Sequence, residues 1–239
     1  MIENLDKFIA GIALGVRFRA NFSIEDQLGQ IIDKILYSKN SFFNPSVFPL
    51  VKSDVGRRML INEETNDVLR IDNSNIILEI QTDAKFKVKD IPKILKHFDT
   101  EIIKGIMKSF AIKEIVRVGY IRRYLFEMQD LAKTFVDKTI GGTLGGVNDI
   151  NLSFSKKIPV AEAIAKRDVN DYNNAIFNIV KKADLNEIFM SVDFQSFYDP
   201  FLTASTDIPF KSFIETAESF NKKNYLPWLN SNYIEGNNG

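Results

Sequence analysis

Apolar and polar residues alternate along two stretches of the chain, residues 8–22 and residues 112–126. A period of two is typical of a strand with one buried face. Each stretch passes directly into a second one, residues 23–37 and residues 128–140, in which apolar residues recur at helical spacing. The pattern therefore predicts two units, each a long strand followed by a helix.

Further elements are expected after the first unit. The hydrophobic pattern predicts three meander strands, at residues 57–62, 68–72 and 75–81. Residues 40–56 contain Pro45 and Pro49 among aromatic residues, so we expect an irregular connection there. The first half then closes with a long helix that runs to about residue 110.

Two residues are expected to cap helices. Ser23, with Asp26 three positions later, resembles a capping box at the start of the first helix. Asp90 is expected to cap the long helix, with Pro92 tolerated in its first turn.

The second half is expected to repeat this order. Strands are predicted at residues 150–157, 160–167, 172–181 and 186–198. A last helix is predicted from Asp207 to about Asn221, and the polar tail from Asn230 is expected to fray.

The two strand–helix units match without a gap when the chain is shifted so that Gly15 meets Gly119. The same shift pairs Arg19 with Arg123, Phe22 with Phe126, Asp26 with Asp130, and Asp33 with Asp137. The tripeptide Asp-Ile-Pro also opens the closing helix of each half, at residues 90–92 and 207–209. We interpret the matches as an internal duplication, the alternative being chance agreement at a favourable offset.

We therefore predict an α+β fold made of two β-α-β(3–4)-α repeats that form one curved antiparallel sheet with helices on one face. Residues 1–111 would be the first half, β-α-β(3)-α, and residues 112–239 the second, β-α-β(4)-α, fused into one globular unit. An antiparallel sheet needs helices on only one face. The other face would be free to bind a partner.

Two resemblances follow. The order of elements resembles the duplicated saddle of folds similar to the TATA-binding protein. Arg117-Val118-Gly119-Tyr120, followed by Arg122, Arg123 and Tyr124, resembles the mid-chain Arg-x-Gly-x-Arg-Tyr-like signature of a sporadically distributed family of uncharacterised prokaryotic proteins. This second resemblance implies a fold and no established activity.

Composition narrows the function classes. The 239 residues contain 31 Lys and Arg against 31 Asp and Glu, and this balance argues mildly against a nucleic-acid or anionic-membrane binder. There is no cysteine, which excludes thiol chemistry and is typical of a cytoplasmic protein. The apolar segment at residues 8–16 is too short to cross a membrane, so no membrane association is expected.

Catalytic and cofactor signatures are weak. His97 is the only histidine, so neither a zinc site of the usual kind nor a catalytic triad is expected, and no cofactor or metal is predicted. Asp26, Asp33, Asp130 and Asp137 are better explained as caps and solvated helix charges. The glycine-rich residues 141–146 follow a helix instead of preceding one, which disfavours a phosphate loop.

Arginines give the best candidate contact surface. If the two long strands meet, Arg17, Arg19, Arg117 and Arg123 would form one basic patch on the open face, with Arg122 on the opposite face. Tyr124, directly after Arg123, is included as a candidate binding residue. The alternative is a face on which these arginines form cross-strand pairs with Glu79, Glu114 or Glu127.

The late aromatic residues Phe194, Phe197, Tyr198, Phe201 and Trp228 are expected to be core, or else a seam where another chain docks. The first functional hypothesis is a non-enzymatic binding or scaffold protein that engages a protein partner, or another copy of itself, through the sheet face or this aromatic region. The second is nucleic-acid or nucleotide binding by the arginine-bearing strands. The third is an enzyme that uses carboxylates with a divalent metal ion.

Overall fold

The computed structural model describes residues 2–39, 41–54, 56–82, 87–110, 112, 114–127, 137–138, 149–159, 170–181, 187–202 and 209–234. The strands are β1 (Ile9–Phe18), β2 (Leu50–Asp54), β3 (Arg57–Asn62), β4 (Asp67–Asp72), β5 (Asn75–Gln81), β6 (Ile115–Phe126), β7 (Ile150–Pro159), β8 (Tyr172–Lys181) and β9 (Ile188–Leu202). The α-helices are α1 (Ser23–Tyr37), α2 (Ile91–His97), α4 (Phe210–Phe220) and α5 (Leu226–Leu229). Short 3-10 helices are η1 (Leu5–Phe8) and η2 (Val88–Asp90), and π-helical segments are η3 (Phe98–Met107), η4 (Asn221–Tyr225) and η5 (Asn230–Ile234).

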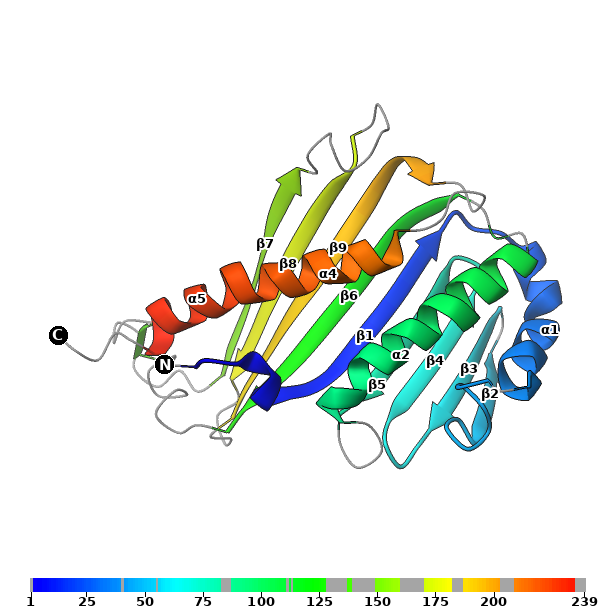
Figure 1. The fold of residues 1–239 in the computed structure, drawn as a ribbon, viewed down its shortest axis with the longest axis horizontal. Helices are drawn as coiled ribbons and strands as arrows, with labels where there is room; N and C mark the ends of the chain where they lie inside the picture. Colours follow the sequence, from blue (N-terminus) through cyan, green and yellow to red (C-terminus); the bar gives the residue numbers. More distant parts are fainter. Residues whose placement is uncertain are drawn as a thin grey trace.

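One antiparallel sheet of nine strands runs through the described chain, in the order β2-β3-β4-β5-β1-β6-β9-β8-β7 (Figure 1). The α+β class and the antiparallel sheet are confirmed. The two long strands predicted from the alternating pattern, β1 and β6, are neighbours at the middle of this sheet. Gly15 lies opposite Gly119, and Arg17 lies opposite Arg117.

The helices pack on one face of the sheet, where α2 and α4 run across the strands (Figure 1). Strand residues facing the helices are buried: Ile12, Leu14 and Val16 on β1 are at most 1% exposed. Phe194 on β9 contacts Phe213 of α4, with ring centroids 5.9 Å apart. Burial of these apolar side chains provides the main stabilisation of the fold.

The face of β1 that points away from the helices carries only small residues before Arg17, namely Gly11, Ala13 and Gly15. No described helix packs on that face. The open face is therefore low at the middle of β1, where Gly15 lies opposite Gly119.

The number of strands in each half differs from the prediction. Residues 50–54 form β2, which extends the predicted meander to four strands and corrects the irregular connection expected at residues 40–56. Pro45 and Pro49 both precede β2, so neither interrupts its pairing with β3. In the second half three strands follow β6 among the described residues, and the strand predicted at residues 160–167 lies outside them.

Helix capping also differs from the prediction. Ser23 is the first residue of α1 and donates its backbone N–H and hydroxyl to the Asn21 side chain. Asp90 stands at the start of α2, but its carboxylate accepts from the backbone N–H of Lys87. Both side chains therefore order the preceding turn instead of capping the helix. The helix predicted at residues 128–140 lies almost wholly outside the described residues, as does the Asp207 cap.

The C-terminal helical segment is longer than predicted. It continues from α4 through η4 and α5 to Ile234, so residues 230–234 are not frayed. Asn230 is buried and makes a pair of hydrogen bonds to the backbone of Ile2: its side-chain oxygen accepts at 2.9 Å, and its amide donates at 2.8 Å. The first and last described segments are thereby joined.

Candidate binding surface

Alternation along β6 sorts the predicted site residues between the two faces. Arg117 and Arg123 face the open side, together with Arg17 of β1. Arg122 and Tyr124 face the helices and are buried. The prediction that Arg122 takes the opposite face is therefore confirmed, whereas Tyr124 does not line the open face.

Arg17 and Arg117 lie directly opposite each other on neighbouring strands. Like charges in that position repel and destabilise a sheet. Arg117 is half buried, donates to Gln195 Oε1 at 3.3 Å, and lies 5.5 Å from the centre of the Phe197 ring. Burial lowers the pKa of Arg117, Asp193 partly offsets this, and Arg17 lowers it further.

Arg17 is exposed, and no described residue forms an ion pair or a hydrogen bond with its guanidinium group. Arg117 and Arg17 thus form an arginine pair in which one member is held in place and the other is available. We call Arg17 and Arg117 the arginine pair below.

A hollow of about 90 Å³ lies beside the arginine pair on the open face. Gly15 of β1 and Gly119 of β6 form its floor, and Ile77, Asp193 and Gln195 line its sides. Ligand pockets for whole small molecules usually measure roughly 300–1,000 Å³. The hollow therefore has room for a single chemical group, not for a complete nucleotide.

The other two arginines of the predicted patch are paired. Arg123 reaches across β1 and forms an ion pair with Glu79 of β5 at 2.9 Å, because the intervening Gly11 and Ala13 are small. Arg19 lies beyond the end of β1 and forms an exposed ion pair with Glu114 at 3.2 Å. The expected four-arginine patch is thus reduced to the arginine pair, and the alternative of cross-strand pairing holds for Arg19 and Arg123.

Two aromatic rings extend the arginine pair across the face. Phe197 of β9 stacks on Tyr172 of β8, with centroids 4.8 Å apart and an interplanar angle of 9°. Arg117 lies over Phe197, and Lys157 lies over Tyr172 at 4.0 Å from its centroid. The order Arg117–Phe197–Tyr172–Lys157 leaves each ring with a neighbour on both sides, so neither offers a free face for stacking a base.

The open face is more cationic than the chain as a whole. Its paired strand positions carry seven basic residues (Arg17, Lys52, Arg57, Arg70, Arg117, Arg123, Lys157) against four acidic ones (Asp54, Asp72, Glu79, Asp193). The whole sequence has no net charge. The described open face therefore has a local excess of positive charge that the composition alone does not indicate.

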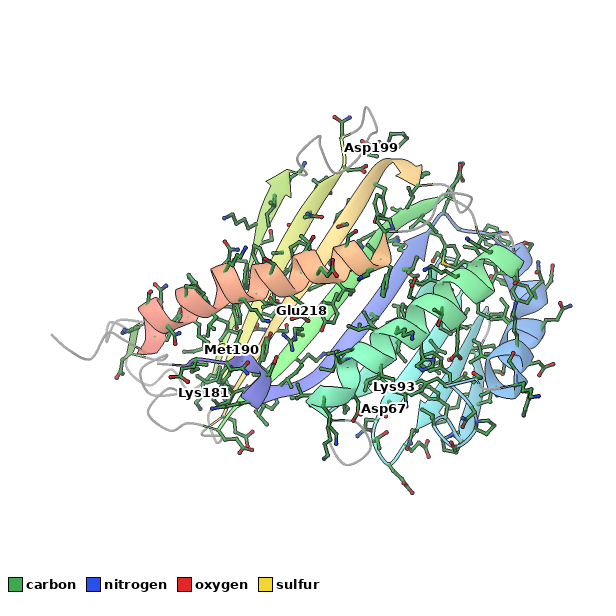
Figure 2. All side chains as sticks on the ribbon, viewed as in Figure 1. Asp67, Lys93, Lys181, Met190, Asp199 and Glu218 are labelled. Atoms are coloured by element: carbon green, nitrogen blue, oxygen red, sulfur yellow. The ribbon has the colours of Figure 1, made fainter. Side chains whose placement is uncertain are left out.

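The helix-covered side of β6 holds a separate network around the buried side chains of Arg122 and Tyr120. Arg122 pairs with Asp6 at 2.6 Å and with Glu218 of α4 at 2.7 Å, and Tyr120 donates to the same Glu218 at 2.7 Å. Figure 2 shows Glu218 projecting from α4 over the central strands. Burial would lower the pKa of Arg122, but the neighbouring tyrosines, Glu218 and Asp6 raise it overall. The network joins η1, β6 and α4. The Arg122 side chain is only 6% exposed, while its partners Asp6 and Glu218 are 39% and 27% exposed.

The late aromatic residues belong mainly to the core. Phe194 and Tyr198 are buried, and Trp228 packs against Phe177 with centroids 6.1 Å apart. Phe197 lies on the open face, and Phe201 is 43% exposed near the end of β9. The C-terminal aromatic region therefore forms helix–sheet packing, and the sheet face is the better candidate for an interface.

Other candidate groups do not assemble into a site in the described residues. His97 Nδ1 lies 2.7 Å from Glu101 Oε1, and its ring stacks on Phe42 at 4.6 Å. Asp26, Asp33 and Asp137 are exposed, while Asp130 and residues 141–146 lie outside the described residues. Within the described ranges, no group of three or more His, Asp or Glu side chains is placed to hold a metal ion.

Sequence reasoning missed Asp193, Gln195, Phe197 and Tyr172 as neighbours of the arginine pair. The alternation along β9 contained part of the signal, since Asp193, Gln195 and Phe197 share one face. The sequence did not indicate which strand pairs with β6, because long-range strand pairing has no local signature.

Comparisons with known proteins give no family. No family model matches the chain, and no curated protein matches it significantly. None of the described helices is both long and apolar enough to cross a membrane. The resemblances drawn from the sequence remain predictions.

Proposed function

We propose that the chain is a non-enzymatic binding protein that engages a partner protein through the open face of its sheet, and that the partner contributes an acidic segment. The observation that carries the proposal is the arginine pair: two like charges lie opposite each other on an open face, and Arg17 has no counter-charge among the described residues. Charge complementarity then favours an anionic partner surface.

A partner protein fits this face better than a second copy of the chain. Two copies docked face to face would bring two basic surfaces together, which costs free energy. The open face also offers hydrogen-bonding side chains, such as Asn174, Asn178 and Ser191, which suit the polar character of a non-obligate interface.

The symmetry of the sheet supports a further part of the proposal, that the two halves are copies of one unit. Equivalent positions of two copies lie opposite each other where a twofold axis passes between adjacent strands. The shift that aligns the halves in sequence makes Gly15 equivalent to Gly119, and these two residues are paired in the β1–β6 register. A duplicated unit would place its two first strands at the centre of the face.

The proposal is tested by reversing charge on the open face away from the hollow. An Arg70→Glu, Lys157→Glu double variant places acidic residues on β4 and β7, and a Lys222→Glu, Lys223→Glu double variant makes the same charge change on η4. A partner captured from the native host is purified and its affinity measured for each variant. The open-face variant should lose binding, and the η4 variant should keep it.

Equal affinity of both variants for the partner, or loss confined to the η4 variant, would overturn the proposal. Circular dichroism of each variant serves as the folding control. If the chain dimerises as its concentration increases, and only the open-face variant abolishes dimerisation, then a second copy of the chain is what binds the open face.

Nucleic-acid binding is the second candidate, and the arginine pair is the observation that favours it, since guanidinium groups also bind phosphate. Against it, both rings of the aromatic stack are covered. A protein that uses phosphate contacts loses affinity steeply as salt increases. Binding of a twenty-nucleotide thymidine strand with a steep salt slope, abolished by Arg17→Glu, would favour this candidate over the first.

A further inference from the structure

We propose that the hollow beside the arginine pair is an anchoring site for one carboxylate group, supplied by an acidic side chain of the partner. This inference rests on the proposed function, because it assigns one site within the open face. It names the chemical group that the central strands of the sheet are arranged to hold.

Repulsion within the arginine pair is the first argument. Arg17 and Arg117 are opposite each other, so each raises the free energy of the other. Asp193 offsets part of this at Arg117, whereas Arg17 has no counter-charge among the described residues. Arg117 is held in place by Gln195 Oε1 and by the Phe197 ring, so little of its conformational freedom remains to be lost on binding. Arg17 is exposed and can close onto the same anion.

The glycines at the floor are the second argument. A Cβ atom added at Gly15 would lie 3.6 Å from Ile77 Cγ1, and one added at Gly119 would lie 3.8 Å from Asp193 Oδ1. Both are ordinary contact distances, and neither glycine has a positive φ. Packing and backbone conformation therefore do not require glycine at either position. The absence of side chains at these two positions leaves the hollow open.

The surroundings favour a carboxylate over a phosphate or a base. Asp193 borders the hollow, so a group with one negative charge is repelled less than a phosphate with about two. The guanidinium fork matches a carboxylate with two parallel hydrogen bonds. The volume of about 90 Å³ and the covered rings leave no place for a nucleobase.

The test uses a fluorescent decaglutamate peptide as the probe, with binding followed by fluorescence polarisation at low salt. Arg17→Gln and Arg117→Gln each remove one arm of the pair, and Gly119→Val fills the hollow while leaving both arginines. Each variant should bind about tenfold more weakly or worse, as expected from loss of charge-assisted hydrogen bonds. Arg57→Gln is the matched control, since it removes one charge from the same face outside the hollow.

The outcomes separate this site from the wider proposal. Decaglutamate that fails to bind, an Arg57→Gln variant as weak as Arg17→Gln, or a Gly119→Val variant with unchanged affinity would each overturn the carboxylate site. If the captured partner still requires the open face while Gly119→Val binds it normally, the inference fails and the proposed function stands. If neither the partner nor decaglutamate depends on the open face, both fail.

A second peptide arm distinguishes the anion. A decapeptide of phosphoserine, compared at equal salt, should be weakened less by Gly119→Val than decaglutamate is, because its larger head groups rest on the surface. Asp193→Asn should strengthen decaglutamate binding, because it removes a negative charge from the rim of the hollow. Preference of the hollow for the phosphopeptide, lost in Gly119→Val, would contradict the assignment to a carboxylate.

Discussion

At the level of single residues, neighbouring positions of one strand lie on opposite faces of the sheet and have different partners. Arg122 and Arg123 are adjacent in sequence, yet the first is enclosed among Asp6, Glu218 and the tyrosines, and the second pairs with Glu79 on the open side. The period of two along β6 decides this difference. The alternating pattern therefore predicts the face of each arginine, but not whether its charge is already paired.

Three buried tyrosines make stability depend on alkaline pH. Burial raises the pKa of Tyr120, Tyr124 and Tyr225 in the folded chain. Unfolded tyrosine loses its proton at about pH 10. Their contribution is therefore fully present below that pH, and the free energy of unfolding should fall as pH rises above it, because the unfolded chain then binds fewer protons than the folded chain.

Urea unfolding measured from pH 8 to pH 11 checks this expectation. Tyr124→Phe should reduce the alkaline loss of stability at little cost at neutral pH, since no described group forms a geometrically acceptable hydrogen bond with the Tyr124 hydroxyl. Tyr37→Phe, which removes a hydroxyl from a side chain that is 70% exposed, is the control variant. A flat profile for the unaltered chain up to pH 11 would contradict the argument.

At the level of single elements, one side-chain amide joins the first and last described segments of the chain. Asn230 of η5 holds the backbone of Ile2 through two buried hydrogen bonds. Asn230→Ala would leave a buried N–H and C=O unsatisfied, at a cost of about 2 kcal/mol in the free energy of unfolding. Asn232→Ala, which removes only an exposed bond to Trp228, should change stability by less than about 0.5 kcal/mol. Chemical denaturation of both variants tests the difference, and equal stabilities would contradict it.

The network around Arg122 fastens α4 to the central strand. Arg122→Met should destabilise the chain by about 3 kcal/mol, because it leaves Glu218 and Asp6 without their buried counter-charge. Arg123→Met, whose ion pair with Glu79 is more accessible, should cost about 1 kcal/mol or less. Thermal or urea unfolding of the two variants measures this difference. A larger loss of stability for Arg123→Met would show that other contacts hold α4 on the sheet.

Long, regular elements were predictable from the sequence. A short strand, and a helical segment whose polar residue is buried through a distant contact, were not. The period of two identified β1 and β6, and helical spacing identified α1, because each pattern extends over several repeats. β2 was missed because its five residues are an exposed edge with little alternation. The extension through η5 was missed because Asn230 and its neighbours are polar, and only the contact with Ile2 makes that polarity suitable for burial.

At the scale of the whole molecule, a chain without net charge presents a sheet face with an excess of basic side chains. Composition could not predict this, because it averages over both faces. The positions of Arg17 and Arg117 on the open face could be predicted, while their direct opposition and the hollow beside them depended on the β1–β6 register. The neighbours Asp193 and Gln195 depended on the β6–β9 pairing, which sequence patterns do not specify.

Nuclear magnetic resonance of the arginine side chains can show directly whether the arginine pair binds a carboxylate. Decaglutamate is titrated into the labelled chain while the Nε–Hε resonances of Arg17, Arg117, Arg57 and Arg122 are followed. The resonances of Arg17 and Arg117 should shift together with a single dissociation constant, while those of Arg57 and the buried Arg122 stay in place. Resonances of Arg17 and Arg117 that stay in place, or an Arg57 shift as large as theirs, would contradict the assignment of the binding site to the arginine pair.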